Sequence, residues 1–477
     1  MLFFSTVVMG AGDLTYSQST NLTIQLKNVS VKDVFREIES KSEFIFIFRD
    51  DIVDLDRKIS LNVKNKNIHY ILNEIFNSTD NRYEVIDRQV VIMKKEPSVV
   101  SSIPDAVVIQ QGVTITGTVT DATGEPLPGV NVVEKGTTIG VYYFDGWSGQ
   151  NRHTVPDGKW ADEPWAKNAP THLTKRFVEE FSGREPVWGW RNDTQEIMER
   201  QIDLAADHGI DFFLFCWYWK DNAGPINVEA IMNDSKHTSM ELYLKAKNKH
   251  RIKFSLLIAN HQGFDIQGAE NWGQATEFWM LYFKDPQYVT VDGKPLIVLF
   301  GSRGIDNDGL AAMQEVAKKR GLKNGLAIAG CGGNKVTGGK NFTHSTHYNV
   351  VPGYADGSEE HKFDELVDAT KAQWIGTEQQ PYIPLLTAGW DKRPWEGPDG
   401  LGQKEGWYFP DSSPEKFKSF LKDAIQWMDD NPKNTTKERL VLIYAWNENG
   451  EGGYLMPTKG DPGAGKLKMI KEVVEGK

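Results

Sequence analysis

The sequence predicts an α/β protein: a (β/α)8 TIM-like barrel preceded by a small α+β domain and a short β segment. All fifteen tryptophans fall between Trp147 and Trp446, so the chain changes character near Gly140. Beyond Gly140, short apolar runs alternate with amphipathic stretches, which is the rhythm of strands followed by helices. The last apolar run opens directly into glutamates, and barrels of this kind carry their chemistry where the strands end.

Composition and charge exclude several classes of function. The chain has 54 basic and 65 acidic residues, a net charge of −11, which argues against nucleic acid or an anionic membrane as its partner. No apolar run reaches the roughly 20 residues that a transmembrane helix needs. We expect Cys216 and Cys331 to be free buried thiols. We expect no cofactor and no metal, since His344 and His347 would face opposite sides of a strand.

The first residues predict where the protein works. Leu2 to Ala11 are apolar or small and are similar to the core of an export signal that lacks its basic start. We therefore interpret residues 1–20 as a signal-like remnant. The expected location is the periplasm, the cell surface or the exterior.

Residues 21–97 predict the small α+β domain, in the order β-α-β-β-α-β-β. The predicted strands are Leu22–Leu26, Phe44–Phe48 and Ile59–Val63, the helices are Val31–Ile38 and Ile68–Ile75, and a hairpin spans Tyr83–Met93. The run Leu-Lys-Asn-Val-Ser-Val-Lys-Asp-Val before and into the first helix, with Phe-Arg-Asp-Asp-Ile after it, resembles the secretin and TonB short N-terminal domain. This resemblance implies a periplasmic module that binds a protein partner. The alternative is an appendage without a function of its own.

Residues 98–112 form a linker rich in Ser, Pro and Val, and residues 113–139 predict two alternating strands about a Gly/Pro turn. The second segment resembles the opening of the carboxypeptidase-regulatory-like β-sandwich of SusC-type receptors. Two strands cannot bury a core by themselves, so this partial segment either docks on a neighbour or marks a fusion. No pattern of a receptor barrel follows, so we do not expect transport.

The barrel is expected over residues 140–477. Its predicted strands are Val141–Phe144, Ile210–Trp219, Ile252–Ala259, Leu296–Phe300, Leu326–Ala329, Thr346–Val350, Ile383–Thr387 and Leu440–Tyr444. Its predicted helices are Thr194–His208, Ser239–His250, Gly309–Arg320, His361–Ile375 and Pro414–Asp430. An open doubly wound sheet is the alternative, but Tyr-Phe-Asp-Gly-Trp follows the first strand where such a sheet has a glycine-rich phosphate loop.

The residues at the predicted strand ends all indicate the same class of ligand. They combine large aromatic rings with short carboxylates and amides, and they are Tyr142, Asp145, Trp147, Trp217, Tyr218, Trp219, Asn260, His261, Trp390, Asp391, Trp446 and Asn447. Rings stack on the C–H faces of sugars and polar groups bind their hydroxyls, so a polysaccharide or oligosaccharide is the expected substrate.

Two of these positions leave alternatives open. Trp217 and Trp219 share one face of a strand and Tyr218 takes the other. Either the tryptophans pack outward against helices and only Tyr218 points inward, or one or two of the three reach the cleft. His261 could contact the ligand or hold the loop by a hydrogen bond.

Glu448 and Glu451 stand three residues apart after the last strand, among glycines and beside Trp446. Two carboxylates in a partly dry pocket cannot both ionise easily, so at least one pKa should rise and the pair can supply an acid and a base. A solvated acidic turn is the alternative. The nearby tryptophan and Tyr454 argue against it.

The motif Trp446-Asn-Glu-Asn-Gly-Glu-Gly452, with Tyr454-Leu-Met-Pro457 after it, resembles the end of the barrel in the glycoside hydrolase family 99-like group, also labelled WbsX-like. The resemblance implies a retaining endo-α-mannosidase. In that chemistry Glu448 takes a proton from the sugar 2-hydroxyl, so that a 1,2-anhydro sugar forms, and Glu451 is the acid for the leaving oxygen and later the base for water. Asn449 departs from the family, which has an aromatic residue there.

Three functions are compatible with this sequence. The leading hypothesis is a retaining hydrolase of an α-linked, mannose-like glycan that works through Glu448 and Glu451. If acid and nucleophile instead flank the bond in the usual way, Asp391 is the candidate nucleophile opposite Glu448. The other two hypotheses are a WbsX-type glycosyltransferase of surface-polysaccharide synthesis and a non-catalytic carbohydrate sensor.

Overall fold

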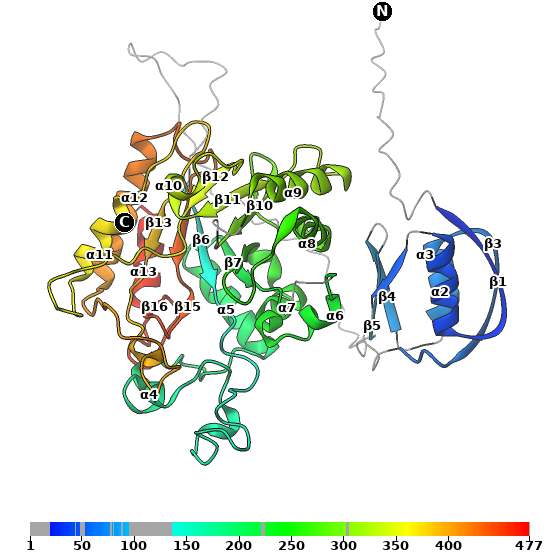
Figure 1. The fold of residues 1–477 in the computed structure, drawn as a ribbon, viewed down its shortest axis with the longest axis horizontal. Coiled ribbons are helices and arrows are strands. Elements are labelled where there is room, and N and C mark those ends of the chain that lie inside the picture. The colour runs from blue at the N-terminus through cyan, green and yellow to red at the C-terminus, as the bar shows by residue number, and fades with distance from the viewer. Residues whose placement is uncertain are drawn as a thin grey trace, which may run out of the picture. The chain divides into compact units, whose positions relative to one another are not determined.

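The computed structural model describes residues 20–42, 44–47, 53–76, 79, 81–86, 89–94, 136–220, 225–301 and 305–476. These residues belong to two compact units, Met1–Val130 and Asn131–Lys477, of which Figure 1 draws the first in blue. Residues 1–19 of the signal-like stretch, the linker 98–112 and residues 113–135 of the partial β segment lie outside the described residues.

The N-terminal unit has the predicted order of strands and helices. Its elements are β1 (Asn21–Ser30), α2 (Val31–Lys41), β2 (Ile45–Ile47), β3 (Lys58–Asn67), α3 (Ile68–Phe76), β4 (Asn81–Ile86) and β5 (Gln89–Lys94). β1 pairs with β3, and β5 lies between β2 and β4. Both helices bury one apolar stripe in the core of this unit. The α+β domain is therefore confirmed.

The second unit is a closed barrel of eight parallel strands. They are β6 (Thr138–Tyr143), β7 (Phe212–Trp217), β8 (Lys253–Ile258), β10 (Lys294–Leu299), β11 (Ala327–Cys331), β12 (His344–Thr346), β13 (Leu385–Thr387) and β14 (Leu440–Tyr444). Each pairs with the next in chain order except β12 with β13, and β14 pairs with β6. A parallel bridge between Ser345 and Tyr382 joins β12 to the residues before β13. The (β/α)8 prediction is confirmed, and the open sheet is wrong.

Two strand boundaries differ from the prediction in ways that matter. β6 begins at Thr138, so the last two residues of the expected β segment belong to the barrel. β12 ends at Thr346, whereas the sequence predicted a strand up to Val350. Tyr348 therefore lies in the loop after the strand, on the face where such barrels build their sites.

Alternate residues of each strand face the inside and the outside of the barrel. On β14, Leu440, Leu442 and Tyr444 belong to the inner core, whereas Val441 and Ile443 belong to the outer core under the helices. On β7 the inner residues are Phe212, Leu214 and Cys216. This alternation decides which side chains can reach the carboxyl end of the barrel.

Helices connect successive strands and cover the outside of the barrel (Figure 1). The longer ones are α5 (Gln195–Asp207), α7 (Thr238–Lys245), α8 (Gly268–Phe283), α9 (Asn307–Lys319), α11 (Phe363–Lys371), α12 (Pro414–Asp430) and α13 (Gly465–Val474). Thr194 and Ser413 cap α5 and α12, as their positions in the sequence predicted. The sequence did not predict α8, because its eight buried residues do not form one narrow stripe.

Candidate active site

A short hairpin closes the carboxyl end of the barrel and carries both glutamates. β15 (Asn447–Glu448) pairs antiparallel with β16 (Gly453–Tyr454), and Glu451 lies in the turn between them. Two glycines let the hairpin approach its neighbours: a Cβ on Gly450 would lie 2.0 Å from the ring of Trp395, and one on Gly453 would lie 2.2 Å from the ring of Tyr444. The glycines of the motif therefore serve close packing, which holds Glu451 beside Tyr444.

Glu448 is buried at the inner side of this hairpin, with 3 % of its surface exposed. Its Oε1 accepts a hydrogen bond of 2.5 Å from the hydroxyl of Tyr348. Its Oε2 has no hydrogen-bond partner among the described residues. A buried carboxylate oxygen without a partner is costly, so this oxygen is available to a substrate group.

Glu451 is half-buried and lies nearer to solvent. The hydroxyl of Tyr444 donates a hydrogen bond to its Oε2. Its backbone carbonyl accepts a hydrogen bond of 2.6 Å from the N–H of Asp391, which ties the hairpin turn to the loop after β13. The two glutamates thus differ in depth, and each is oriented by one tyrosine of the barrel.

The two carboxyl groups share an environment that disfavours charge. Burial and then the negative charge of Glu451 raise the pKa of Glu448 well above its usual range, against the hydrogen bond from Tyr348. Burial also raises the pKa of Glu451, against the hydrogen bond from Tyr444 and the positive charge of Lys392. Such a pair titrates as a unit, so the two carboxyl groups can share one proton and act as acid and base together.

Asp391 is a third carboxylate near the hairpin, but it is fully engaged. Its oxygens accept hydrogen bonds from Arg393 at 2.8 Å and from Arg184. Burial alone would raise the pKa of Asp391, yet the hydrogen bond from Arg393 and the charges of both arginines hold it below the usual value. Asp391 therefore remains ionised and anchors the hairpin, because Arg184 also donates to the carbonyl of Asn449 at 3.1 Å.

Aromatic rings line the barrel beside the glutamates. Tyr348 is the centre of this group: its ring lies 5.0 Å from those of Tyr444 and Phe300 and 4.9 Å from that of Tyr142. The group continues from Phe300 to His261, 5.7 Å away, and on to Tyr218, whereas Trp390 lies 6.2 Å from Tyr444 on the other side. The structure thus brings Tyr142, Tyr218, His261 and Trp390 together with the glutamates.

Comparison with known families identifies the barrel. The profile described as Glycosyltransferase WbsX matches residues 190–374 and 340–469, which is more than half of the chain. The chain belongs to the WbsX family. A second profile, the secretin and TonB N terminus short domain, matches residues 44–95, so both of these resemblances are confirmed. A search of curated proteins gave no match.

Solved structures similar to the chain include two carbohydrate-related proteins. One is the GH99 endo-alpha-mannosidase from Bacteroides thetaiotaomicron in complex with bis-tris-propane, with a TM-score of 0.46 and 14 % identity over 72 % of this chain and 96 % of that chain. The other is a glycoside hydrolase-like protein with a TM-score of 0.46 and 16 % identity over 73 % of this chain and 96 % of that one.

In this WbsX-family barrel the tryptophans predicted to bind substrate support the structure from outside the strands. Trp217, Trp219 and Trp446 belong to the outer core, where Trp217 meets the edge of Trp279 at 5.1 Å and Trp446 donates to Gln201 at 2.7 Å. Trp147 is buried in a separate cluster with Phe177. None of these four joins the rings around the glutamates, and for Trp217 strand alternation gives the outward face.

Three predicted polar residues of the WbsX-family site fasten loops to one another. The side chain of Asn447 bonds the N–H and the carbonyl of Phe144 at 2.8 and 2.7 Å. Asn260 does the same for Gly301, at 2.8 and 2.6 Å. Asp145 accepts hydrogen bonds from the N–H of Ser239 and from two hydroxyls, although burial raises its pKa to about 6. These residues shape the site and leave little of their polarity for a ligand.

Sequence reasoning missed Tyr348 and Tyr444, which orient the two glutamates. Tyr444 was counted only as the end of a strand, and Tyr348 was placed inside one. Tyr348 could have been found by the criterion applied to the other strands, which is an aromatic residue just beyond the end of a barrel strand.

Across the residues that the structure describes, no three His, Cys, Asp or Glu side chains gather as metal ligands. His347 instead bonds the hydroxyl of Tyr382 at 2.9 Å. Cys216 and Cys331 are both buried. Within the described chain, no helix combines the length and the apolar character needed to cross a membrane.

Proposed function

We propose that this protein is a retaining glycoside hydrolase that cleaves an α-linked, mannose-like polysaccharide or oligosaccharide. The observation that carries the proposal is the pair Glu448 and Glu451 on one hairpin at the carboxyl end of the barrel. Burial raises the pKa of both, and Glu448 is buried more deeply than Glu451. The surrounding rings of Tyr348, His261 and Trp390 supply the surfaces on which sugars stack.

The proposed reaction uses the two glutamates in turn. Glu448 takes the proton of the sugar 2-hydroxyl, and the resulting oxygen attacks C1 as the bond to the leaving oxygen breaks, while Glu451 protonates that oxygen. In the second step Glu451 takes a proton from water, which attacks C1 and opens the 1,2-anhydro ring, and Glu448 returns its proton to the sugar oxygen. Two inversions at C1 give retention.

The depth of the two carboxyl groups supports these roles. Glu448 is buried, and its oxygen without a partner suits a hydroxyl of the sugar bound above it. Glu451 is half-buried, so it can reach the leaving group and then water. Asp391 accepts hydrogen bonds from two arginines and is a poor nucleophile, which favours the paired mechanism over the arrangement with carboxylates on opposite flanks.

The N-terminal unit gives the proposed hydrolase its context. Its match to a short domain of secretins and TonB-dependent proteins supports a periplasmic location and binding to a protein partner through this unit. The protein would then bind and cleave its glycan in the periplasm or at the cell surface.

The experiment is turnover of the full chain on a panel of α-mannans and other bacterial and fungal polysaccharides, beside Glu451→Gln. New reducing ends from the wild type and at least 100-fold fewer from the variant are expected, since general acid catalysis contributes about 10²–10⁴-fold. If the wild type binds a glycan and releases no sugar, the hydrolase proposal fails and the sensor takes its place.

A second candidate is transfer rather than hydrolysis, and the description of the matching family as a glycosyltransferase favours it. A transferase would release a nucleotide from a sugar nucleotide such as GDP-mannose in the presence of an acceptor glycan. Nucleotide release that depends on the acceptor, without any hydrolysis of the panel, would replace the hydrolase proposal by this one.

A further inference from the structure

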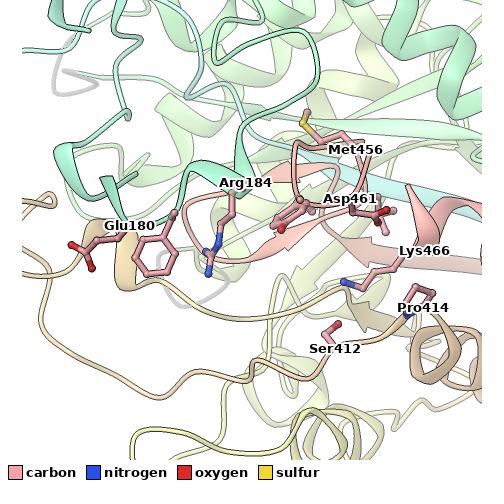
Figure 2. A pocket seen from close by; sticks show the side chains of 12 residues that line it. Glu180, Arg184, Ser412, Pro414, Met456, Asp461 and Lys466 are labelled. Atoms are coloured by element: carbon pink, nitrogen blue, oxygen red, sulfur yellow. The ribbon is translucent and has the colours of Figure 1, made fainter. Parts of the chain in front are cut away.

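A cavity of about 550 Å³ lies beside β16 of the hairpin that carries the two glutamates (Figure 2). Its walls come from three parts of the chain: residues 180–184, the start of α12, and residues 454–466 between β16 and α13. Phe181 and Tyr454 contribute aromatic surface, and Ser412 contributes a hydroxyl. Pockets of about 300–1,000 Å³ are of the size that binds small organic molecules.

Two cationic side chains face this cavity. Lys466 extends its ammonium group into it (Figure 2), and within the described residues this group makes no hydrogen bond and no ion pair. Burial, with the nearby charge of Arg184, lowers the pKa of Lys466 to about 8, although Asp461 acts in the opposite direction. The guanidinium of Arg184 lies beside the ring of Phe181, 4.8 Å from its centre.

Two carboxylates also line the cavity, and neither forms an ion pair with Lys466. Glu180 forms a bidentate pair with Arg176 at 2.9 Å. Asp461 accepts a hydrogen bond of 2.8 Å from the N–H of Gly465. The ammonium of Lys466 is thus the cation of this cavity that lacks an ion pair, since Arg184 is paired with Asp391. Asp461 acts on Lys466 only through its charge. An isolated buried charge is unfavourable, so a ligand of opposite charge would stabilise it.

The ends of two helices add to the positive potential. Pro414, the first residue of α12, lines the cavity, and Lys466 is the second residue of α13. The positive end of a helix dipole favours anions. These helices follow the seventh and eighth strands of the barrel, and the corresponding loops commonly bind phosphate in barrels of this fold.

We infer that this cavity binds an oxyanion (a carboxylate, sulfate or phosphate group) carried by a sugar, with Lys466 as its counter-ion and the rings of Phe181 and Tyr454 as its sugar-binding surface. The cavity is far larger than an inorganic ion, and its aromatic walls suit the apolar face of a sugar. The inference does not depend on hydrolysis by Glu448 and Glu451. It adds an accessory site for acidic glycans.

The test is calorimetric titration of the full chain with mannose 6-phosphate, glucuronate, mannose, inorganic phosphate and inorganic sulfate. We expect an anionic sugar to bind at least tenfold more tightly than mannose and than either inorganic ion. Lys466→Met should weaken that binding at least tenfold, whereas Lys468→Met, which changes an exposed lysine of the same helix, should not. Equal binding of mannose, or an unchanged affinity in Lys466→Met, would overturn the inference. Equal binding of inorganic phosphate would assign the cavity to a free ion and contradict the sugar.

A second measurement works on the wild-type protein and so does not depend on how the variant folds. At pH 8, acetylation of Lys466 by acetic anhydride is followed by mass spectrometry, with Lys468 as internal reference. The anionic sugar that binds should slow modification of Lys466 and not of Lys468. The inference would be overturned if mannose slowed acetylation of Lys466 as much as the anionic sugar does, or if no anionic sugar slowed it.

Discussion

At the scale of single residues, the proposed chemistry depends on two tyrosine hydroxyl groups that donate hydrogen bonds to the glutamates. Tyr348 stabilises the ionised form of Glu448 and Tyr444 that of Glu451, each against burial. Because a hydrogen bond to a charged group contributes roughly 1.5–3 kcal/mol, these tyrosines help to set the pH range in which one glutamate is ionised and the other protonated.

Tyr348→Phe should therefore move the acidic limb of the pH profile. Without the hydroxyl of Tyr348 the pKa of Glu448 rises further, so a larger fraction of Glu448 is protonated and cannot act as the base. We therefore expect kcat/KM at pH values below the optimum to fall by about tenfold. Tyr444→Phe should instead raise the pKa of Glu451 and extend activity on the alkaline side. Profiles of kcat/KM between pH 4 and 9 measure both; an acidic limb that does not move in Tyr348→Phe contradicts the role of that tyrosine.

Glu448→Gln should change how stability depends on pH. A carboxyl group whose pKa is raised by folding favours the folded state at low pH and costs stability as pH rises above its unfolded value near 4.3. The Tm of the variant relative to wild type should therefore increase between pH 4 and pH 8, by about 2 °C or more. Glu405→Gln, at an exposed glutamate, is the control. If the difference in Tm between Glu448→Gln and wild type stayed constant from pH 4 to pH 8, folding would not raise the pKa of Glu448.

The sequence shows which residues lie at the ends of the barrel strands, but it does not show which face of a strand each side chain occupies. Glu448 and Glu451 could be found because they follow an unmistakable strand. Trp217 and Trp219 could not be placed, because alternation gives two faces and the sequence does not say which is inside. The structure puts Cys216 and Tyr218 inside and the tryptophans outside.

At the scale of elements, the hairpin after β14 is the part that makes the site. Its ends are fastened by Asn447 on one side and by the arginines around Asp391 on the other. Asn449 is buried, and its side-chain amide donates a hydrogen bond of 2.8 Å to the carbonyl of Arg184. It therefore helps to hold the turn.

Gly450→Ala tests whether this close packing positions Glu451. The new methyl group would overlap the ring of Trp395, so the hairpin must shift, at a cost of about 1–3 kcal/mol in stability and at least tenfold in kcat. Gly273→Ala in α8 is the matched control, because its methyl group would meet Val316 at an ordinary 3.7 Å and should be neutral or stabilising by about 0.5–1 kcal/mol. Full activity in Gly450→Ala would mean that the hairpin tolerates displacement.

Elements were predicted well where one apolar pattern dominated. Seven barrel strands are short apolar runs and were found. The sixth, His344–Thr346, is polar and shares only Thr346 with the predicted strand Thr346–Val350. The helix α8 was missed, since Trp272, Trp279 and Phe283 leave it without a simple polar face.

At the scale of the whole molecule, two units with separate cores share one chain. The change in composition near Gly140 reflects this division, because the barrel alone needs tryptophans to fill the wide space between strands and helices. What composition could not give is barrel closure, which depends on the pairing of β14 with β6 across some 300 residues.

The central claim is that Glu448 is the base and Glu451 the acid of a glycosidase, and substrates with different leaving groups test it most directly. A fluoride leaving group needs no proton, so Glu451→Gln should hydrolyse an α-mannosyl fluoride within about tenfold of the wild type while losing 10²-fold or more on the natural linkage. Glu448→Gln should lose both activities. The assigned roles are wrong if Glu451→Gln loses activity equally on the fluoride and on the natural linkage. They are also wrong if Glu448→Gln still hydrolyses the fluoride.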